Sequence, residues 1–250
     1  MASADMPRKS TGRPDAKAVR TDEAAVGETA ERIKRSVPVR AVVALGLGVI
    51  AAIAFLEIAD FVREGHSTVL DRAVSLRVHE LDSDGMDRVM KAFTVAGEIR
   101  AIVILAATLA AVLVWQRARA LCFLLIAIVS TSIFLNWLLK THFHRTRPDL
   151  FFEIVAPLSY SFPSGHALIS SASYGAMAIV LARLVPRLRW AFYAGAAALV
   201  LGIGLSRIYL GVHWATDVLA GYAVGALLLV AFESAAFRVR EPGVVRGSAR

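Results

Sequence analysis

Residues Pro163 to Leu184 read PSGHALISSASYGAMAIVLARL, and this stretch combines a fold signal with a chemical motif. From Ala167 to Leu184 the residues are apolar or small, and the single charge, Arg183, lies at the end of the run. A helix that crosses a bilayer needs about 20 such residues. The stretch therefore predicts a membrane-spanning helix that begins directly after a proline, a serine, a glycine and a histidine.

Five more apolar runs of similar length accompany it. They are about Val39–Ala59, Ile99–Val114, Ala118–Leu139, Trp190–Leu205 and Trp214–Phe232. Of the 250 residues 57% are hydrophobic, and the mean hydropathy is +0.60, which exceeds the apolar share of an ordinary soluble domain. Backbone groups inside a bilayer must bond within their own segment, so runs of this length form helices. The chain is predicted to be all-α, a six-transmembrane-helix bundle.

The polar stretch between the first two runs, about residues 61–97, carries a second helical pattern. Met86, Val89, Met90 and Phe93 recur at helical spacing, with charged residues on the opposite side. This pattern predicts a short amphipathic interfacial helix between spans 1 and 2. A helix packed over the membrane domain is a compatible alternative.

The two ends of the chain differ in composition from the middle. Residues 1–37 are polar and lack apolar periodicity, which predicts a disordered cytoplasmic tail. Residues 38–234 hold the six spans, and residues 235–250 form a basic cytoplasmic tail.

Charge placement predicts the orientation of the chain. The net charge is +8, but the cations lie in the tails and in short loops beside the apolar runs, which argues against a nucleic-acid partner. Six spans put both termini on one side, and nine lysine and arginine residues up to Arg40 lie on that side. The positive-inside rule then predicts a multi-pass protein of the cell (inner or plasma) membrane with both termini cytoplasmic.

The single cysteine, Cys122, lies in an apolar run and forms no intrachain disulfide.

Three short motifs in the second half carry the chemistry. They read Lys140-Thr-His-Phe-His-Arg-Thr-Arg147-Pro148, then Pro163-Ser164-Gly165-His166, then Ser206-Arg207-Ile-Tyr-Leu-Gly-Val-His213-Trp-Ala-Thr-Asp217. They fall at the end of the third span, the start of the fourth, and the junction of the fifth and sixth. In a six-span topology these places share one membrane face, which the charge rule makes the outer face.

The residue types in these motifs favour a phosphate ligand. Lys140, Arg147 and Arg207 supply three cations for phosphate oxygens. Ser164 and Gly165 stand where a helix N-terminus offers free N–H groups to an anion. Each feature has a plain alternative, since a cation at a membrane boundary snorkels and a serine before a helix caps it. Their combination with two histidines favours binding.

The two histidines and one carboxylate are suited to nucleophilic catalysis. His213 and Asp217 are four residues apart, so they share one helical face, and the carboxylate can fix the tautomer of the ring. His166 comes from another span and is available as a proton donor. No cluster of His, Asp or Glu has metal-ligand spacing, so no metal cofactor is indicated.

In order and spacing the motifs resemble the signature of the type 2 phosphatidic acid phosphatase superfamily, Lys-x6-Arg-Pro, Pro-Ser-Gly-His and Ser-Arg-x5-His-x3-Asp. The chain resembles the integral-membrane, lipid phosphate phosphatase branch. The resemblance implies hydrolysis of a membrane lipid phosphate or diphosphate, of the undecaprenyl diphosphate or phosphatidic acid type, without a cofactor. It implies His213 as the nucleophile that forms a phosphohistidine, His166 as acid and then base, and Asp217 as the residue that orients His213. It implies Lys140, Arg147, Ser164, Gly165 and Arg207 as substrate-binding residues.

Two other functions use the same residues. A lipid phosphotransferase would pass the phosphate to a second lipid instead of water, and a membrane transporter would use the charges as an ion path. Six aromatic residues near the motifs suit an interfacial belt or an access portal: Phe143, Phe151, Phe152, Tyr160, Phe162 and Trp214. The residues carry no signal for an oligomeric state.

Overall fold

The computed structural model describes residues 39–150 and 159–239, and from Ala44 onward they belong to one unit, to which the following description applies. The predicted tail over residues 1–37, residues 240–250 of the second tail, and Phe151 and Phe152 lie outside the described residues.

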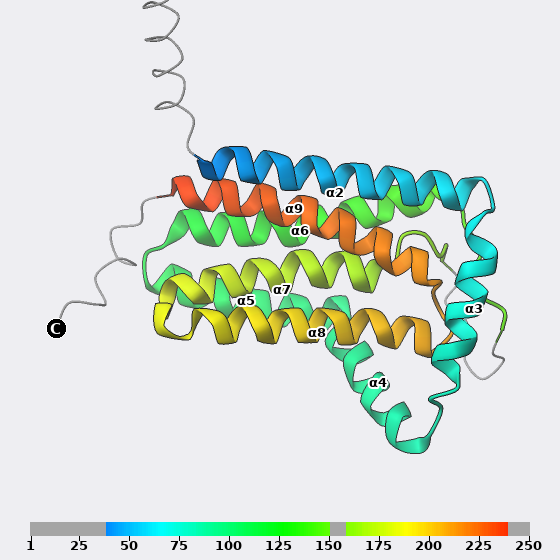
Figure 1. Cartoon of the computed structure of the whole chain (residues 1–250). Coiled ribbons are helices and arrows are strands. Elements are labelled where there is room, and N and C mark those ends of the chain that lie inside the picture. Colours follow the sequence, from blue (N-terminus) through cyan, green and yellow to red (C-terminus); the bar gives the residue numbers. More distant parts are fainter. Residues whose placement is uncertain (1–38, 151–158, 240–250) are drawn as a thin grey trace, which may run out of the picture. The chain divides into compact units, whose positions relative to one another are not determined.

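Each predicted span coincides with one helix (Figure 1). The six are α2 (Val39–Arg63), α5 (Ile99–Trp115), α6 (Arg119–Phe143), α7 (Gly165–Leu184), α8 (Arg189–Tyr209, after a 3-10 turn over Pro186–Leu188) and α9 (Ala215–Arg238). All except α5 are individually long and apolar enough to cross a bilayer. The 17-residue α5 meets this standard together with α4 (Asp84–Ala96), across a bend of 54°. The all-α prediction with six spans is confirmed.

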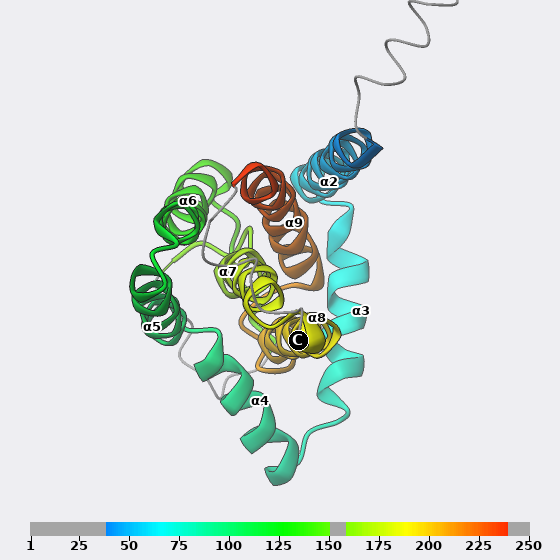
Figure 2. The same cartoon turned by 90° about the vertical axis from the view of Figure 1, so that its left-hand side faces the viewer.

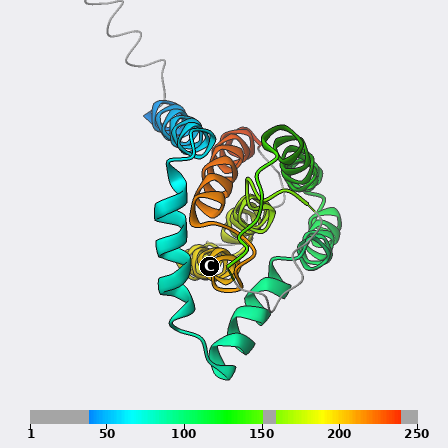
Figure 3. The ribbon, with the colours of Figure 1, turned by 90° about the vertical axis from the view of Figure 1, so that its right-hand side faces the viewer.

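Two helices, rather than the single predicted one, lie between α2 and α5. Helix α4 contains the predicted amphipathic pattern: Met90 is buried and Phe93 packs against Gly202 of α8, whereas Val89 is 48% exposed. Helix α3 (Ser67–His79) was not predicted. Its buried residues are polar, Ser67, Asp71 and Ser75, so a search for apolar periodicity does not find it. Viewed from the right-hand side of Figure 1, α3 runs across the ends of bundle helices, whereas α4 lies at the side of the bundle and leads into α5 (Figure 3).

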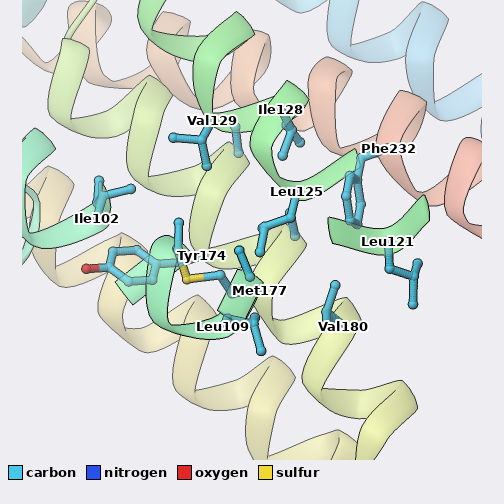
Figure 4. Close-up of a cluster of buried hydrophobic side chains, with 14 of the residues drawn as sticks. Ile102, Leu109, Leu121, Leu125, Ile128, Val129, Tyr174, Met177, Val180 and Phe232 are labelled. Carbon is cyan, nitrogen blue, oxygen red and sulfur yellow. The ribbon is translucent and has the colours of Figure 1, made fainter. Parts of the chain in front are cut away.

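Helix α7 occupies the centre of the bundle, with α5, α6, α8 and α9 around it (Figure 2). Twelve of its twenty residues are buried, and most of these are alanine, serine or medium-sized aliphatic residues. The larger side chains form a core between α5, α6, α7 and α9 that includes Leu109, Leu125, Met177 and Phe232 (Figure 4). Small residues on α7 let its neighbours approach closely, as is typical of helices packed in a membrane.

One close approach sets the position of the second motif. A Cβ atom at Gly221 of α9 would lie 2.7 Å from the carbonyl oxygen of Ser164 and 2.9 Å from the Cβ of Ala167. The Ser164 N–H also donates to the Asp217 carbonyl oxygen at 2.9 Å. The first turns of α7 and α9 are therefore in direct backbone contact, and this contact brings two of the three motifs together.

We expect Gly221→Ala to lower the free energy of unfolding by about 1–3 kcal/mol, the usual cost of an added methyl in a filled site. Gly46→Ala is the matched control, since a Cβ there meets nothing within 4 Å in the same kind of helix. Both variants gain the same helix propensity, so the difference isolates the contact with Ser164. Thermal unfolding in detergent measures it, and equal melting temperatures for the two variants would contradict this account.

Candidate active site

A cavity of about 180 Å³ lies where α6 and α8 end and α7 begins. Helix α3 crosses this end of the bundle (Figure 1). It brings together six of the eight predicted site residues: Lys140, Arg147, Gly165, His166, Arg207 and His213. Gly97, Ile99, Asn136, Ser159 and Ile169 complete its lining. The other two predicted residues, Ser164 and Asp217, are fully buried beside it. The three motifs therefore meet at one end of the bundle, as the span count predicts.

His213 lies between a carboxylate and the cavity. It is 2% exposed, its Nδ1 is 3.3 Å from Asp217 Oδ2, and its Nε2 is 3.1 Å from Nη1 of Arg147. With the proton on Nδ1, the unprotonated Nε2 faces the cavity and accepts from Arg147 Nη1. Burial lowers the pKa of His213 to about 4, although Asp217 opposes the shift. The ring is therefore neutral at physiological pH, as a nucleophile must be.

Asp217 is held in place by its own helix. It is the third residue of α9, and its Oδ2 accepts the Trp214 backbone N–H at 2.9 Å and the Ser161 hydroxyl. A carboxylate in the first turn is also favoured by the positive end of the helix dipole. The predicted contact between Asp217 and His213 is present, but His213 precedes the N-cap of α9, so the two residues do not share a helical face as predicted.

The three cations reach the cavity from different segments. Lys140 is in the last turn of α6 and donates to the Tyr160 carbonyl oxygen. Helix α6 ends at Phe143, and His144 adopts a left-handed conformation with φ 49°. Arg147 follows in irregular backbone, where its Nε donates to the Ser159 carbonyl oxygen at 2.8 Å. Lys140 and Arg147 are seven residues apart, close to two turns of a helix. Because α6 ends between them, only Lys140 is helical.

Arg147 and Arg207 are both oriented by neutral oxygen atoms. Arg147 Nη1 donates to the Val212 carbonyl oxygen at 2.6 Å, and Arg207 Nη1 donates to Thr94 Oγ1 at 3.1 Å. Burial lowers the pKa of the Arg147 guanidinium, because removal from water disfavours its charge. Three neighbouring cations in a small cavity repel one another, and an anion between them would offset this repulsion.

Four polar atoms around the cavity lack a hydrogen-bond partner. They are Asn136 Oδ1, Ser164 Oγ, His166 Nε2 and Arg207 Nε, all buried. Ser164 precedes α7 but makes no side-chain capping bond, so the plain capping alternative does not describe it. Buried polar atoms in proteins are nearly always paired. Of these atoms, Ser164 Oγ and Arg207 Nε carry a hydrogen that an oxygen atom of a ligand could accept, which is compatible with an oxyanion at this site.

Some residues near the motifs have other roles. Phe162 is fully buried against Phe55 and Phe143, with ring centroids 6.0 and 4.8 Å away, so its assignment to a belt or portal is wrong. Tyr160 remains 42% exposed. Among the described residues, no group of three or more His, Cys, Asp or Glu side chains is placed to hold a metal ion.

Sequence reasoning missed four residues at or behind the site. Asn136 lines the cavity one turn before Lys140, and a Cβ at Gly165 would lie 2.9 Å from its Oδ1. A polar side chain within a span was the available signal. Ser161, Arg145 and Asp71 contact Asp217 or one another behind His213, and the signature names none of them.

Known proteins resemble this chain over most of its length. The model of the PAP2 superfamily matches residues 119–240. Phosphatidylglycerophosphatase B of Bacillus subtilis is 31% identical over 177 residues, which are 70% of this chain and 87% of that protein. The chain belongs to the PAP2 superfamily.

Other PAP2 relatives support this assignment. The crystal structure of a transmembrane PAP2 type phosphatidylglycerolphosphate phosphatase from Bacillus subtilis has a TM-score of 0.73 at 28% identity, covering 78% of this chain and 98% of that chain. An undecaprenyl-diphosphatase of Sulfolobus acidocaldarius is 34% identical over 122 residues, 47% of this chain and 56% of that protein. The PAP2 match covers α6 to α9, which carry all three motifs. The family resemblance read from the motifs is confirmed, and so is the fold.

We expect the cavity of this PAP2 protein to bind a phosphate-like oxyanion without any lipid. Saturating orthovanadate should raise the melting temperature in detergent, since a ligand at 100 times its Kd stabilises the folded state by about 2.7 kcal/mol. Arg207→Gln should abolish the shift, because it removes a cation from the cavity.

The control is Arg119→Gln, which removes an exposed cation at the opposite end of α6. It should keep the full vanadate shift. Equal shifts for the two variants would show that vanadate binds elsewhere.

Proposed function

We propose that this chain hydrolyses the terminal phosphate of a membrane lipid phosphate or diphosphate, through a phosphohistidine at His213 and without a metal cofactor. One observation carries the proposal. His213 places Nε2 on the cavity wall 3.1 Å from Arg147 Nη1, while Nδ1 faces the buried carboxylate of Asp217. A neutral imidazole fixed in this way is positioned to attack an atom held between the cations.

In the first step Nε2 of His213 attacks phosphorus and forms an N–P bond. The bond from phosphorus to the leaving oxygen breaks, and its electron pair stays on that oxygen. His166, charged while the anionic substrate is bound, gives the leaving oxygen a proton. Asp217 stabilises the positive charge that develops on the ring of His213.

In the second step water attacks the phosphohistidine. His166 is now neutral and takes a proton from the water as its oxygen bonds to phosphorus. The N–P bond breaks, inorganic phosphate leaves, and both histidines return to their starting states. Lys140, Arg147 and Arg207 neutralise the phosphoryl oxygens in both steps, with Ser164 Oγ and the Gly165 N–H as further donors. Fixed side-chain cations thus do what metal ions do in many phosphoryl transfers.

The size of the cavity supports a lipid substrate class. At about 180 Å³ it is smaller than the roughly 300 Å³ at which pockets for whole small molecules begin. It therefore suits a phosphate group whose hydrocarbon part stays in the bilayer. Two relatives are named a phosphatidylglycerophosphatase and an undecaprenyl-diphosphatase, which supports lipids of these types as substrates of this chain. The gathering of Lys140, Arg147 and Arg207 at one end of the bundle favours surface chemistry over an ion path.

Charge placement supports an outward-facing site in the cell membrane. Arg117 of the α5–α6 turn lies at the end of α5 opposite the cavity, and the count of six spans in the sequence assigns the cation-rich N-terminal segment to the same side, which the positive-inside rule makes cytoplasmic. An outward site favours recycling of a carrier lipid such as undecaprenyl diphosphate, because that lipid is released on the outer face.

We expect His213→Ala to lower kcat at least about 10³-fold, since it removes the nucleophile, and His166→Ala to lower kcat about 10²–10⁴-fold. His142→Ala is the control and should keep full activity, because His142 is exposed and does not line the cavity. Phosphate release in detergent is measured with phosphatidic acid, phosphatidylglycerophosphate and undecaprenyl diphosphate, each with and without EDTA.

The same assay separates the alternatives. Full turnover by His213→Ala would refute the phosphohistidine. Loss of activity in EDTA that magnesium restores would refute a metal-free reaction. Phosphate release only when a second lipid acceptor is added would identify a phosphotransferase.

Sidedness is tested with single cysteines in a Cys122→Ala background. Gly85→Cys lies at the cavity end in an open position, and Gln116→Cys lies in the exposed turn at the opposite end. In intact cells an impermeant thiol reagent should label Gly85→Cys alone. Labelling of Gln116→Cys alone would place the site in the cytoplasm.

A further inference from the structure

Arg145 belongs to the first motif, but its side chain does not line the cavity. It is 14% exposed and bridges α3 and α9 behind the site. Nη2 donates to Asp71 Oδ2 at 2.7 Å and to Ser67 Oγ at 2.9 Å, and Nη1 donates to Asp217 Oδ1 at 2.5 Å and to Thr216 Oγ1 at 2.8 Å. One guanidinium therefore satisfies four oxygen atoms on two helices.

This contact divides the two oxygens of Asp217 between different partners. Oδ1 accepts from Arg145, while Oδ2 lies toward His213. Without Arg145, Oδ1 would have no partner among the described hydrogen bonds, and only the contacts of Oδ2 with Trp214, Ser161 and His213 would oppose a turn of the carboxylate about its Cβ–Cγ bond. Such a turn would break the contact that fixes the tautomer of His213.

Asp71 holds the other side of the guanidinium and the start of α9. It is fully buried on α3; its Oδ1 accepts the Thr216 N–H at 2.9 Å and its Oδ2 accepts the Thr216 hydroxyl at 2.7 Å. It thereby caps α9 from outside that helix, next to Asp217. Planar arginine suits this bridge because its donors form a rigid fork, which lysine cannot reproduce.

We propose that Arg145, held by Asp71, is a positioning residue for phosphoryl transfer. It locks the carboxylate of Asp217 so that Oδ2 stays on Nδ1 of His213 and Nε2 stays on the cavity side. This inference rests on the proposed role of His213 as the nucleophile. Partners of this kind behind a reactive group commonly change activity about 10–100-fold when they are removed.

The test compares Arg145→Lys, Arg145→Ala and Asp71→Asn with Arg147→Lys, which alters a cation of the cavity itself. We expect each Arg145 and Asp71 variant to lower kcat about 10–100-fold, with KM and the vanadate dissociation constant within about threefold of wild type. Arg147→Lys should raise both KM and the vanadate constant. Acid-labile phosphohistidine after a rapid quench should form more slowly in the Arg145 variants.

Chemical rescue separates positioning from plain structural support. Guanidinium at millimolar concentration should restore part of the kcat of Arg145→Ala, and sodium at equal ionic strength should not. Melting temperatures and vanadate binding show which variants are folded. If Arg145→Ala does not fold, the comparison of kcat, KM and vanadate binding is made with Arg145→Lys.

Three results would overturn the inference: wild-type kcat in the folded variants, a rise in KM and the vanadate constant like that of Arg147→Lys, or no rescue of a folded Arg145→Ala. A failure of the proposed function looks different. It would appear as full turnover by His213→Ala, measured in parallel, whatever the Arg145 variants do.

Discussion

The carboxylate of Asp217 is fully buried in the first turn of a membrane-spanning helix, where an unpaired charge is costly. Its partners come from three other places in the chain: Arg145 after α6, Ser161 before α7, and His213 with Trp214 before α9. Pairing one buried charge therefore ties together the ends of three helices. The nucleophile that we propose is one of these partners, so its orientation follows from the same constraint.

The cavity differs from the surroundings of Asp217, because the charged side chains that line it are all positive. Lys140, Arg147 and Arg207 line about 180 Å³, and none of the described residues of the lining is a carboxylate. The three cations repel one another, and the buried polar atoms Ser164 Oγ and His166 Nε2 beside them have no protein hydrogen-bond partner. Binding a phosphate group would satisfy the cations and the polar atoms together. In the function that we propose, this repulsion among the cations favours the binding of a phosphate group and stabilises the transition state.

Close helix packing fixes the position of Asp217 and its partners relative to the cation-lined cavity. Small residues on α7 and Gly221 on α9 let the helices approach until their backbones touch at Ser164. The bend between α4 and α5 places Gly97 against the ring of His166, where a Cβ would lie 2.8 Å from the Cδ2 atom of that ring. These contacts leave little freedom at the site, since packed interiors resist small displacements.

The sequence by itself determined the spans, the end of the bundle where the motifs meet, and the eight candidate site residues. The spans follow from length and hydropathy alone, because the thickness of the bilayer fixes how many apolar residues a spanning helix needs. The number of spans between the motifs suffices for the second. Local spacing suffices to bring His213 close to Asp217, although His213 precedes the N-cap of α9 and does not share a helical face with Asp217.

Only the tertiary structure decided what stands behind these residues. Arg145 and Asp71 are 74 residues apart and meet because α3 crosses the end of the bundle. Helix α3 buries polar residues, so its packing leaves no apolar period in the sequence. Phe162 and Tyr160 are two aromatic residues in one segment, yet one is buried and the other exposed. Such differences depend on which distant segments fill the space around a side chain, and the spacing of residues along the chain does not contain that information.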